Sequence, residues 1–431
     1  MKINDKRLMK NLHTLKTFTD TPDDGVTRFS YGKQDAKARA YILKRAEDAG
    51  CSVYIDPLQN IIIDLKTNTP GSPSVVCGSH IDTVKNGGWL DGIYGVCGAL
   101  EVMETLAQSG VSGNGVNYRM VIFAEEEGSG FGSTMTGSKF ISGIYKDENL
   151  DSLKRDDGKS LREILSGLSP HPSVCAEVAG NAPAVYSDEK FSPEKTVWDF
   201  DKIKTMLELH IEQGPVLDRE GLSLGIVDSI FGMRVIEVTL TGVGNHAGAT
   251  PMTERYDAMC TAAECILSAE KTVKSDADKR TVVTVGKLEV MPNCSNVIPE
   301  TVKFSLEVRD KDEEKINKFT DQIIEDIKHI ANRRSVSCLI KEHSKSSPLH
   351  LSDRLISSMT ARAEDQNLSF KVMDSGAVHD ACMIAYHADT GMIFVPSIDG
   401  RSHVPEEDTK ESDLVAGAQF LLDTVLAELN I

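Results

Sequence analysis

Five short segments of the sequence concentrate histidine and carboxylate side chains, the groups that bind metal ions in proteins. Histidine combined with carboxylate suits zinc or another borderline divalent ion, whereas a site made only of oxygen ligands would suit magnesium or calcium. Two such ions ~3.5–4 Å apart need a bridging carboxylate or water. The segments are residues 78–83, 89–96, 123–128, 207–215 and 400–407.

The first two segments supply a histidine and two aspartates. His80 and Asp82 lie two residues apart, so in an extended chain both face one side, and the carboxylate can accept the second imidazole N–H. Asp91 comes just before a helical stretch and could bridge two ions. Both features also have an ordinary alternative. His80 and Asp82 could be a surface His-x-Asp pair, and Asp91 could be the N-cap of a helix.

The other three segments add an acidic run and two histidines. Residues 125–127 are all glutamate and follow an apolar strand. They would repel one another unless a positive ion binds there, although a solvated acidic loop is the alternative. His210 lies within an apolar strand, where a histidine is more often a hydrogen-bonded core residue than a metal ligand. His403 alone would be weak evidence for a metal site. Together the segments indicate a metal site, because each lies at or near the end of a predicted strand.

Strand-like and helix-like stretches alternate in the first part of the chain and again near its end. This alternation predicts an α/β fold with a mostly parallel sheet and helices on both faces. Ligands bind beyond the carboxyl ends of the strands in such sheets, which is where the polar segments fall. The expected strands are Ser74–Gly78, Tyr118–Ala124, Met206–Ile211, Phe370–Met373 and Met392–Pro396, and the expected helices are Tyr94–Leu106, Asp353–Asp365 and Asp413–Leu429.

The middle of the chain has a different pattern, which predicts a smaller domain inserted into the first. Its elements follow the order β-α-β-β-α-β of a ferredoxin-like α+β fold. We therefore expect a large domain formed by residues 1–227 and 343–431, interrupted by an insert at residues 228–342. The expected elements of the insert are Val235–Thr241, Tyr256–Val273 (helix), Thr281–Val290, Val302–Val308, Glu313–Ala331 (helix) and Val336–Glu342.

Length and composition agree with a two-domain globular protein and argue against several classes of partner. A chain of 431 residues exceeds what one core usually holds, and 40% hydrophobic with 26% charged residues is ordinary. The net charge of −18 argues against nucleic acid or an anionic membrane as partner. Nine scattered cysteines, with no secretory leader and no long apolar run, lead us to expect a cytoplasmic protein.

Six motifs spread along the chain resemble those of one enzyme branch. They are GSHIDTV, LDGIYGV, AEEEG, ELHIEQG, NHAGATPM and GRSHVPEE. Through them the chain is similar to the carbamoylase and ureido-amidohydrolase branch of the di-metal exopeptidase and aminoacylase superfamily. That branch includes N-carbamoyl-L-amino acid hydrolases, β-ureidopropionase, allantoate amidohydrolase and ureidoglycolate amidohydrolase. The resemblance runs in the expected order from about residue 24 to the end of the chain.

The resemblance implies two divalent metal ions and a general base. The ligand types allow zinc, manganese, cobalt or nickel. Glu126 would be the base, although the run of three glutamates leaves a one-residue ambiguity with Glu125. His210 favours this branch, because related peptidases usually have an acidic residue there. One ion would be held by His80, Asp91 and His210, and the other by Asp91, Glu127 and His403.

The resemblance also implies residues that contact the substrate. His246 in the insert would stabilise the transition state, while Asn296 would bind substrate and Arg309 would clamp its carboxylate with a bidentate fork. His246 and Asn296 would act from the partner subunit of a homodimer formed through the insert. Gln213 is a further candidate contact. Each residue of the insert could instead be an ordinary polar residue of a lid. The resemblance also places His379 near the site. Val378 beside it replaces a glycine of many relatives, which leaves the shape of the pocket open.

The expected function is metal-assisted hydrolysis of a carbamoyl or ureido C–N bond in a small carboxylate substrate. An N-carbamoyl-L-amino acid would yield the amino acid, CO2 and ammonia. Allantoate is the alternative substrate, and an exopeptidase or acylase is disfavoured by the histidine at position 210. A metal-binding scaffold without turnover is a further alternative, which the presence of the base Glu126 disfavours.

Overall fold

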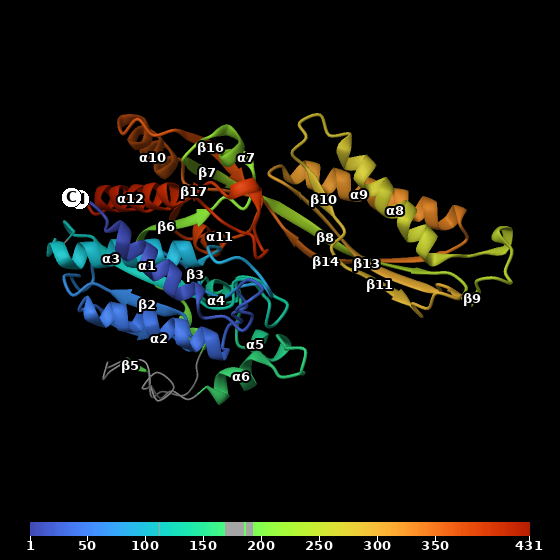
Figure 1. The fold of residues 1–431 in the computed structure, drawn as a ribbon, viewed down its shortest axis with the longest axis horizontal. Coiled ribbons are helices and arrows are strands. Elements are labelled where there is room, and N and C mark those ends of the chain that lie inside the picture. The colour runs from blue at the N-terminus through green and yellow to red at the C-terminus, as the bar shows by residue number, and fades with distance from the viewer. Residues whose placement is uncertain (112, 169–184, 187–192) are drawn as a thin grey trace. The chain divides into compact units, whose positions relative to one another are not determined.

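A computed structural model describes residues 1–111, 113–168, 185–186 and 193–431, which form two compact units (Figure 1). Unit 1 contains residues 1–228, 351–373 and 377–431. Unit 2 contains residues 229–350 and 374–376. In the described part of the chain, no helix is long and apolar enough to cross a membrane.

Among the described residues, unit 1 contributes most of a ten-stranded sheet, in the order β15-β7-β17-β6-β3-β4-β2-β1-β5 with β16 beside β7. The four central strands, β17, β6, β3 and β4, run parallel, so their carboxyl ends meet at one edge. The strands are β1 Ser52–Ile55, β2 Ile61–Asp64, β3 Ser74–His80, β4 Asn117–Phe123, β5 Val185–Tyr186, β6 Ile203–Ile211, β7 Leu224–Ile230, β15 Leu349–His350, β16 Phe370–Ser375 and β17 Asp389–Val395.

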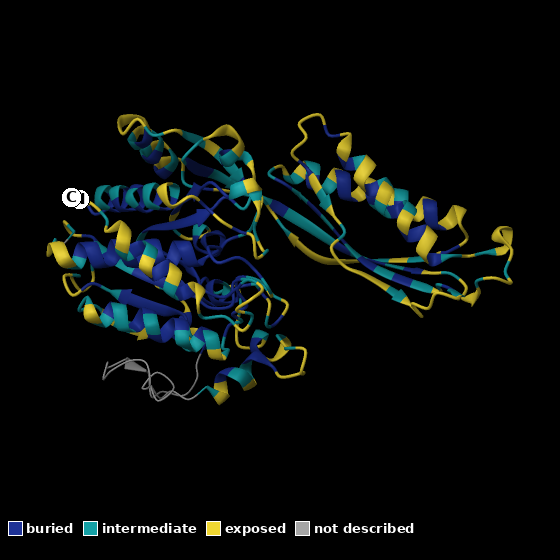
Figure 2. Cartoon of the chain, in the orientation of Figure 1, coloured by how far each residue is buried: buried dark blue, intermediate teal, exposed yellow. Residues whose placement is uncertain are grey.

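Helices cover both faces of this sheet. Successive residues of a strand point to opposite faces, so each central strand contributes apolar side chains to the packing on both sides. Met120 and Ile122 of β4 join a large core, to which helices α1 (Asp5–Lys16), α2 (Lys33–Asp48), α3 (Ile93–Ser109), α10 (Asp353–Asp365) and α12 (Glu411–Glu428) contribute. Val121 and Phe123 pack instead with residues of α4 (Thr136–Ile141) and α11 (Asp380–Ala385). The central strands are consequently buried (Figure 2).

The remaining helical elements that the structure describes in unit 1 are short. They are α5 Asn149–Ser152, α6 Leu161–Gly167 and α7 Val216–Glu220, with the 3-10 turns η2 Pro193–Thr196, η3 Phe200–Lys202 and η5 Ile398–Gly400. η5 lies between β17 and the segment that carries His403.

Unit 2 has a five-stranded antiparallel sheet in the order β10-β13-β8-β14, with β11 beside β13. Alternate residues of β13 are buried, and their apolar side chains share a core with the two long helices. The elements follow the predicted order β-α-β-β-α-β if β10 and β11, which both pair with β13, are counted as one interrupted strand. They are β8 Gly232–Thr241, α8 Ala258–Lys274, β10 Val282–Thr284, β11 Leu288–Met291, β13 Thr301–Asp310, α9 Glu313–Arg333 and β14 Ser337–Ser346, with the small pair β9 Asn245–His246 and β12 Val297–Ile298 and the turn η4 Met252–Glu254.

The predicted α/β class is confirmed, but the prediction of one continuous strand at Thr281–Val290 is wrong. Thr284 pairs with Glu307 and Leu288 pairs with Phe304 on β13, so residues 285–287 lie opposite only residues 305 and 306. This extra residue is a β-bulge, which separates β10 from β11. Gly286 lies at its centre, where a residue without a side chain is typical.

Candidate metal centre

The carboxyl edge of the parallel strands brings the predicted ligand segments together. β3 ends at His80, β6 ends one residue after His210, and the glutamate run follows β4. Asp91 lies in the loop before α3. The site therefore follows from the parallel order of strands that are far apart in the sequence.

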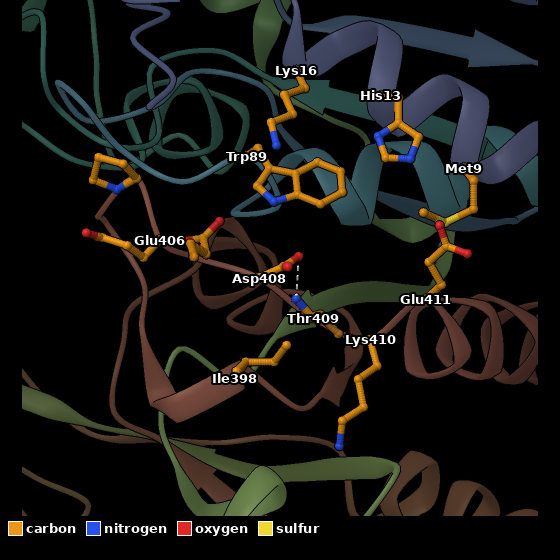
Figure 3. A pocket seen from close by; sticks show the side chains of 12 residues that line it. Met9, His13, Lys16, Trp89, Ile398, Glu406, Asp408, Thr409, Lys410 and Glu411 are labelled. Atoms are coloured by element: carbon orange, nitrogen blue, oxygen red, sulfur yellow. Dashed lines mark hydrogen bonds between the residues drawn. The ribbon is translucent and has the colours of Figure 1, made fainter. Parts of the chain in front are cut away.

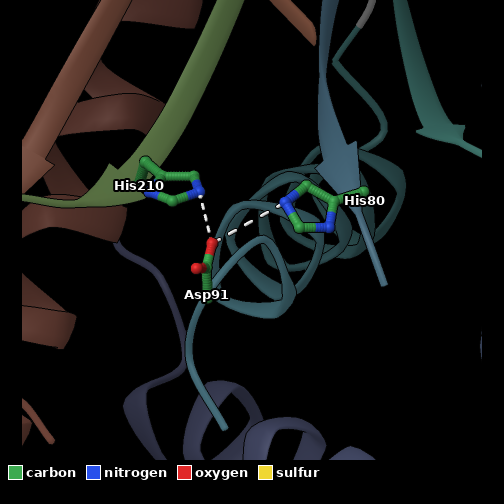
Figure 4. Close-up of side chains that lie close together, drawn as sticks. All are labelled: His80, Asp91 and His210. Atoms are coloured by element: carbon green, nitrogen blue, oxygen red, sulfur yellow. Dashed lines mark ion pairs between the residues drawn. The ribbon is translucent and has the colours of Figure 1, made fainter. Parts of the chain in front are cut away.

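Asp91 is at the centre of the arrangement and is only 4% exposed. Its Oδ1 atom lies 3.0 Å from His210 Nε2 and 3.7 Å from His80 Nε2 (Figure 4). Its Oδ2 atom lies 2.9 Å from Nε2 of His403. The two oxygens of one carboxylate thus face two different sets of candidate ligands, which is the arrangement that a bridging ligand requires.

The two histidines on strands present the same ring nitrogen to the site. His80 Nδ1 lies 3.0 Å from the carbonyl oxygen of Asp82, and His210 Nδ1 lies 2.9 Å from that of Ile211. A proton on Nδ1 of the neutral ring satisfies each carbonyl and directs the Nε2 lone pair toward the site, where a metal ion could bind. The backbone N–H of Gly92 lies 3.2 Å from Nε2 of His210.

Glu126 and Glu127 complete the cluster. Glu126 Oε2 lies 3.7 Å from His80 Nε2, and Glu127 Oε2 lies 3.5 Å from His403 Nε2. In each of three groups, the candidate ligand atoms all lie within 4.8 Å of one another. The groups are His80 with Asp91 and His210, Asp91 with Glu127 and His403, and His80 with Glu126 and Glu127.

The electrostatics of the cluster favour a cation. Burial and the repulsion from Glu127 raise the pKa of Glu126 well above its usual value. Burial and the repulsion from Asp91 do the same to the pKa of Glu127. Divalent ions would relieve this repulsion and would find imidazole and carboxylate ligands of the kind they prefer. The residues present therefore fit a di-metal centre.

The histidines respond to the same carboxylates. Burial lowers the pKa of His210, but its hydrogen bond to Asp91 outweighs this and raises the pKa to about 9. The hydrogen bond to Asp91 also raises the pKa of His403 to about 9, against a smaller effect of burial. Burial would raise the pKa of Asp91, but both histidines hold it well below its usual value.

Asp82 has a different role from the one expected of its carboxylate. Its carboxylate oxygen lies 3.7 Å from His80 Nδ1, and the nearer acceptor is its own backbone carbonyl. The carboxylate instead accepts the backbone N–H groups of Glu126 (3.2 Å) and Glu127 (3.1 Å). Asp82 therefore supports both the ring of His80 and the turn that carries the two glutamates.

Two further side chains, both named by the resemblance, lie near the candidate ligands. The Gln213 amide donates to Asp91 Oδ2 at 2.8 Å, and its own side-chain oxygen is buried with no hydrogen-bond partner among the described residues.

His379 is 3% exposed, and the centroid of its ring lies 4.6 Å from that of the His210 ring. With Glu208 these two histidines form a fourth group of possible ligands, while Val378 is half-buried beside it. Residue types alone give no signal for Glu208, since it lies inside a strand.

The predicted substrate residues of the insert lie in unit 2. His246 and Asn296 are exposed, on and beside the small β9–β12 pair, where the backbone oxygen of Asn296 accepts from Ala247 at 3.0 Å. Arg309 on β13 contacts Glu307 Oε1 at 2.5 Å through Nε and donates to the carbonyl of Gly376 at 2.9 Å.

Comparison with known proteins agrees with these observations. The model of peptidase family M20/M25/M40 matches residues 76–427. N-carbamoyl-L-amino-acid amidohydrolase of Paenarthrobacter aurescens is 35% identical over 98% of this chain and 97% of its own length. Allantoate amidohydrolase of Escherichia coli (strain K12) is 34% identical over 96% of this chain and 95% of its own.

A solved structure supports the same assignment over the whole fold. It is a hydantoinase/carbamoylase family amidase from Burkholderia multivorans, with a TM-score of 0.82 and 32% identity over 99% of this chain and 98% of the other. The predicted branch is thereby confirmed. The chain belongs to peptidase family M20/M25/M40 and is a hydrolase of its amidohydrolase branch.

Proposed function

We propose that the chain cleaves the carbamoyl or ureido C–N bond of a small carboxylate substrate, and that this substrate is an N-carbamoyl-L-amino acid. The observation that carries the proposal is the Asp91 carboxylate, which faces His80 and His210 with one oxygen and His403 with the other. The similarity to an N-carbamoyl-L-amino-acid amidohydrolase over nearly the whole chain supports the substrate class.

Five residues would hold the two ions: His80, Asp91, Glu127, His210 and His403. Divalent ions bound there would supply Lewis-acid polarisation and would lower the pKa of a water molecule toward neutrality. Zinc, manganese, cobalt and nickel all accept these ligand types.

Glu126 would act as the general base. Its carboxylate lies beside His80 but belongs to neither of the two proposed ligand sets. Burial and Glu127 raise its pKa, which strengthens it as a proton acceptor. Having taken a proton from water, it would pass that proton to the departing nitrogen, so that ammonia can leave.

His246 would stabilise the developing oxyanion. Its Nδ1 atom accepts the backbone N–H groups of Gly248 (3.1 Å) and Ala249 (3.2 Å). A neutral ring must therefore carry its proton on Nε2, which makes that nitrogen a hydrogen-bond donor. Arg309 would bind the substrate carboxylate, and Asn296 and Gln213 would provide polar contacts.

The experiment that tests the proposal is ammonia release by the metal-loaded chain from a substrate panel. The panel contains several N-carbamoyl-L-amino acids, β-ureidopropionate, allantoate and ureidoglycolate. Their matched controls are an N-acetyl amino acid, assayed as free amino acid, and a dipeptide. The proposal expects the highest kcat/KM with an N-carbamoyl-L-amino acid. Preference for allantoate would favour the second candidate, which the similar enzyme of Escherichia coli supports. Preference for the N-acetyl compound or the dipeptide would contradict the proposal.

We also propose a homodimer formed through unit 2. Strand β14 is at one end of the antiparallel sheet, and in the described part of the chain it pairs with β8 alone. An unpaired strand edge exposes backbone donors and acceptors that a second copy can satisfy. Leu339 on this strand is 54% exposed, which adds apolar area to the same edge.

A further inference from the structure

The carboxylate of Glu407 is buried between two loops that are more than 300 residues apart in sequence. The residue is 1% exposed, whereas its neighbour Glu406 is exposed. Glu407 Oε1 accepts the backbone N–H groups of Leu90 (2.9 Å) and Asp91 (3.0 Å). Its Oε2 accepts the hydroxyl of Ser402 at 2.7 Å and the N–H of His403 at 3.3 Å.

The loop before Asp91 is shaped around this carboxylate. A Cβ atom added at Gly88 would overlap the Glu407 carboxyl group, so any side chain at position 88 would displace it. Figure 3 shows the outer side of the same junction, where Trp89 and the segment that contains Glu406 and Asp408 line one cavity of about 490 Å³. The two loops therefore lie side by side, and Glu407 joins them.

We propose that Glu407 is a positioning residue, which holds the bridging ligand Asp91 and the ligand His403 at the separation that two metal ions require. The inference rests on the proposed metal centre. Each oxygen of Glu407 binds one loop, so a single rigid carboxylate fixes the distance between residues 91 and 403. Partners that orient metal ligands commonly contribute about 10–100-fold in metal affinity or activity.

The chemistry requires a carboxylate at this position. Three of the partners of Glu407 are backbone N–H groups, which can only donate, and they approach both of its oxygens. An ionised carboxylate is acceptor-only, with two oxygens available. A glutamine of the same length would turn its NH2 group either toward the backbone N–H of His403 or toward those of Leu90 and Asp91. Glu407→Gln therefore removes the link to one loop while leaving the volume of the side chain almost unchanged.

The test measures metal binding rather than turnover. Chelator-treated full-length chain is titrated with Mn2+ by calorimetry, and the visible absorption of the Co2+-loaded chain reports the ligand geometry. Far-UV circular dichroism confirms that each variant is folded before titration. Glu407→Gln is expected to weaken Mn2+ binding by about 10–100-fold and to change the Co2+ spectrum. The matched control is Glu406→Gln, whose exposed side chain lies 3.6 Å from Arg401, and it should leave both readouts unchanged.

Gly88→Ala provides a second route to the same carboxylate. It should weaken Mn2+ binding as well, and the double variant with Glu407→Gln should be little worse than either single variant, because both remove one link. If Glu407→Gln does not fold, Gly88→Ala carries the test alone. Folded variants with wild-type Mn2+ affinity and Co2+ spectrum would overturn the role of Glu407, and so would loss of folding in both. A wild-type chain that binds no metal would instead overturn the metal centre itself.

Discussion

Glu125 and Glu126 are neighbours in the chain, but their carboxylates lie in different surroundings. Glu125 has a positive φ of 55° and accepts the backbone N–H groups of Gly130 (2.7 Å) and Phe131 (3.1 Å). Glu126 instead faces His80. The geometry thus separates two residues that the sequence alone could not distinguish as candidates for the base.

The first prediction concerns this pair. Glu126→Gln should keep its metal content and fold but lose at least about 100-fold in kcat, because a general base contributes about 10²–10⁴-fold. Glu125→Gln is the matched control and should retain most of the wild-type kcat. The measurement is steady-state ammonia release together with metal analysis. An active Glu126→Gln and an inactive Glu125→Gln would move the base to residue 125.

The second prediction is a pH dependence of metal affinity. His210 and His403 both have a pKa raised to about 9 in the metal-free chain, so at pH 7 both rings carry a proton that a metal ion must displace. Affinity for Mn2+ should consequently rise between pH 6 and pH 9 and level off above that range. The slope should approach about tenfold per pH unit for each displaced proton.

Calorimetric titration at several pH values, in two buffers with different ionisation enthalpies, measures both the affinity and the number of protons released. Affinity that stays constant from pH 6 to pH 9, with no proton release, would contradict the prediction.

Local patterns indicated the ligand candidates but not their supports. Histidines and carboxylates at strand ends can be recognised from residue type and position, as at His80 and Asp91. The tasks of Asp82 and Glu407 could not be predicted, because both depend on backbone N–H groups from segments distant in the sequence. Only the folded chain brings those donors to the carboxylate.

At the scale of elements, the site depends on how closely α3 approaches the sheet. Gly95 lies in the first turn of α3, and a Cβ atom there would overlap the carbonyl oxygen of Leu209 on β6 and the Cβ of Ser79 on β3. Those neighbours include backbone of a central strand, which cannot move without disturbing its hydrogen bonds. The close approach keeps Asp91, just before α3, near the ends of both strands.

The third prediction follows from this contact. Gly95→Ala should lower the free energy of unfolding by about 1–3 kcal/mol, the usual cost of overpacking a core. Gly167→Ala is the matched control, since a Cβ there meets no atom of the described residues within 4 Å, and its effect should stay within about 0.5 kcal/mol. Denaturant unfolding of the metal-free proteins measures both. Equal stability of the two variants would show that the fold does not depend on close contact between α3 and the strands at Gly95.

The sequence predicted the long elements better than the short ones. Helix Asp353–Asp365 begins and ends where its periodic pattern predicts. The bulge at Gly286 divides a strand whose apolar sequence pattern continues without a break. The sequence could not show the bulge, because its position depends on how the two halves of the strand pair with β13. Helices α1 and α2 were not predicted, since their charged residues obscure the pattern and some become buried. Arg39, for instance, is 9% exposed and bonds Asp35.

At the scale of the whole molecule, the fourth prediction is that the chain is a homodimer. Static light scattering at micromolar concentration should give twice the mass of 47.0 kDa. Leu339→Lys on the exposed edge strand β14 should weaken association, because it places like charges at a two-fold interface. Leu267→Lys is the control, since this residue is 64% exposed on α8, away from that edge. A monomeric wild-type chain would contradict the prediction.

We propose that this chain hydrolyses a carbamoyl or ureido C–N bond by means of divalent ions held around Asp91. The most direct measurement is ammonia release from N-carbamoyl-L-amino acids by one preparation in three states: as purified, after chelation, and after addition of Mn2+ or Zn2+. We expect chelation to abolish ammonia release and added metal to restore it, with His80→Ala and His403→Ala remaining inactive and binding less metal. Undiminished ammonia release by the metal-free chain would contradict the account.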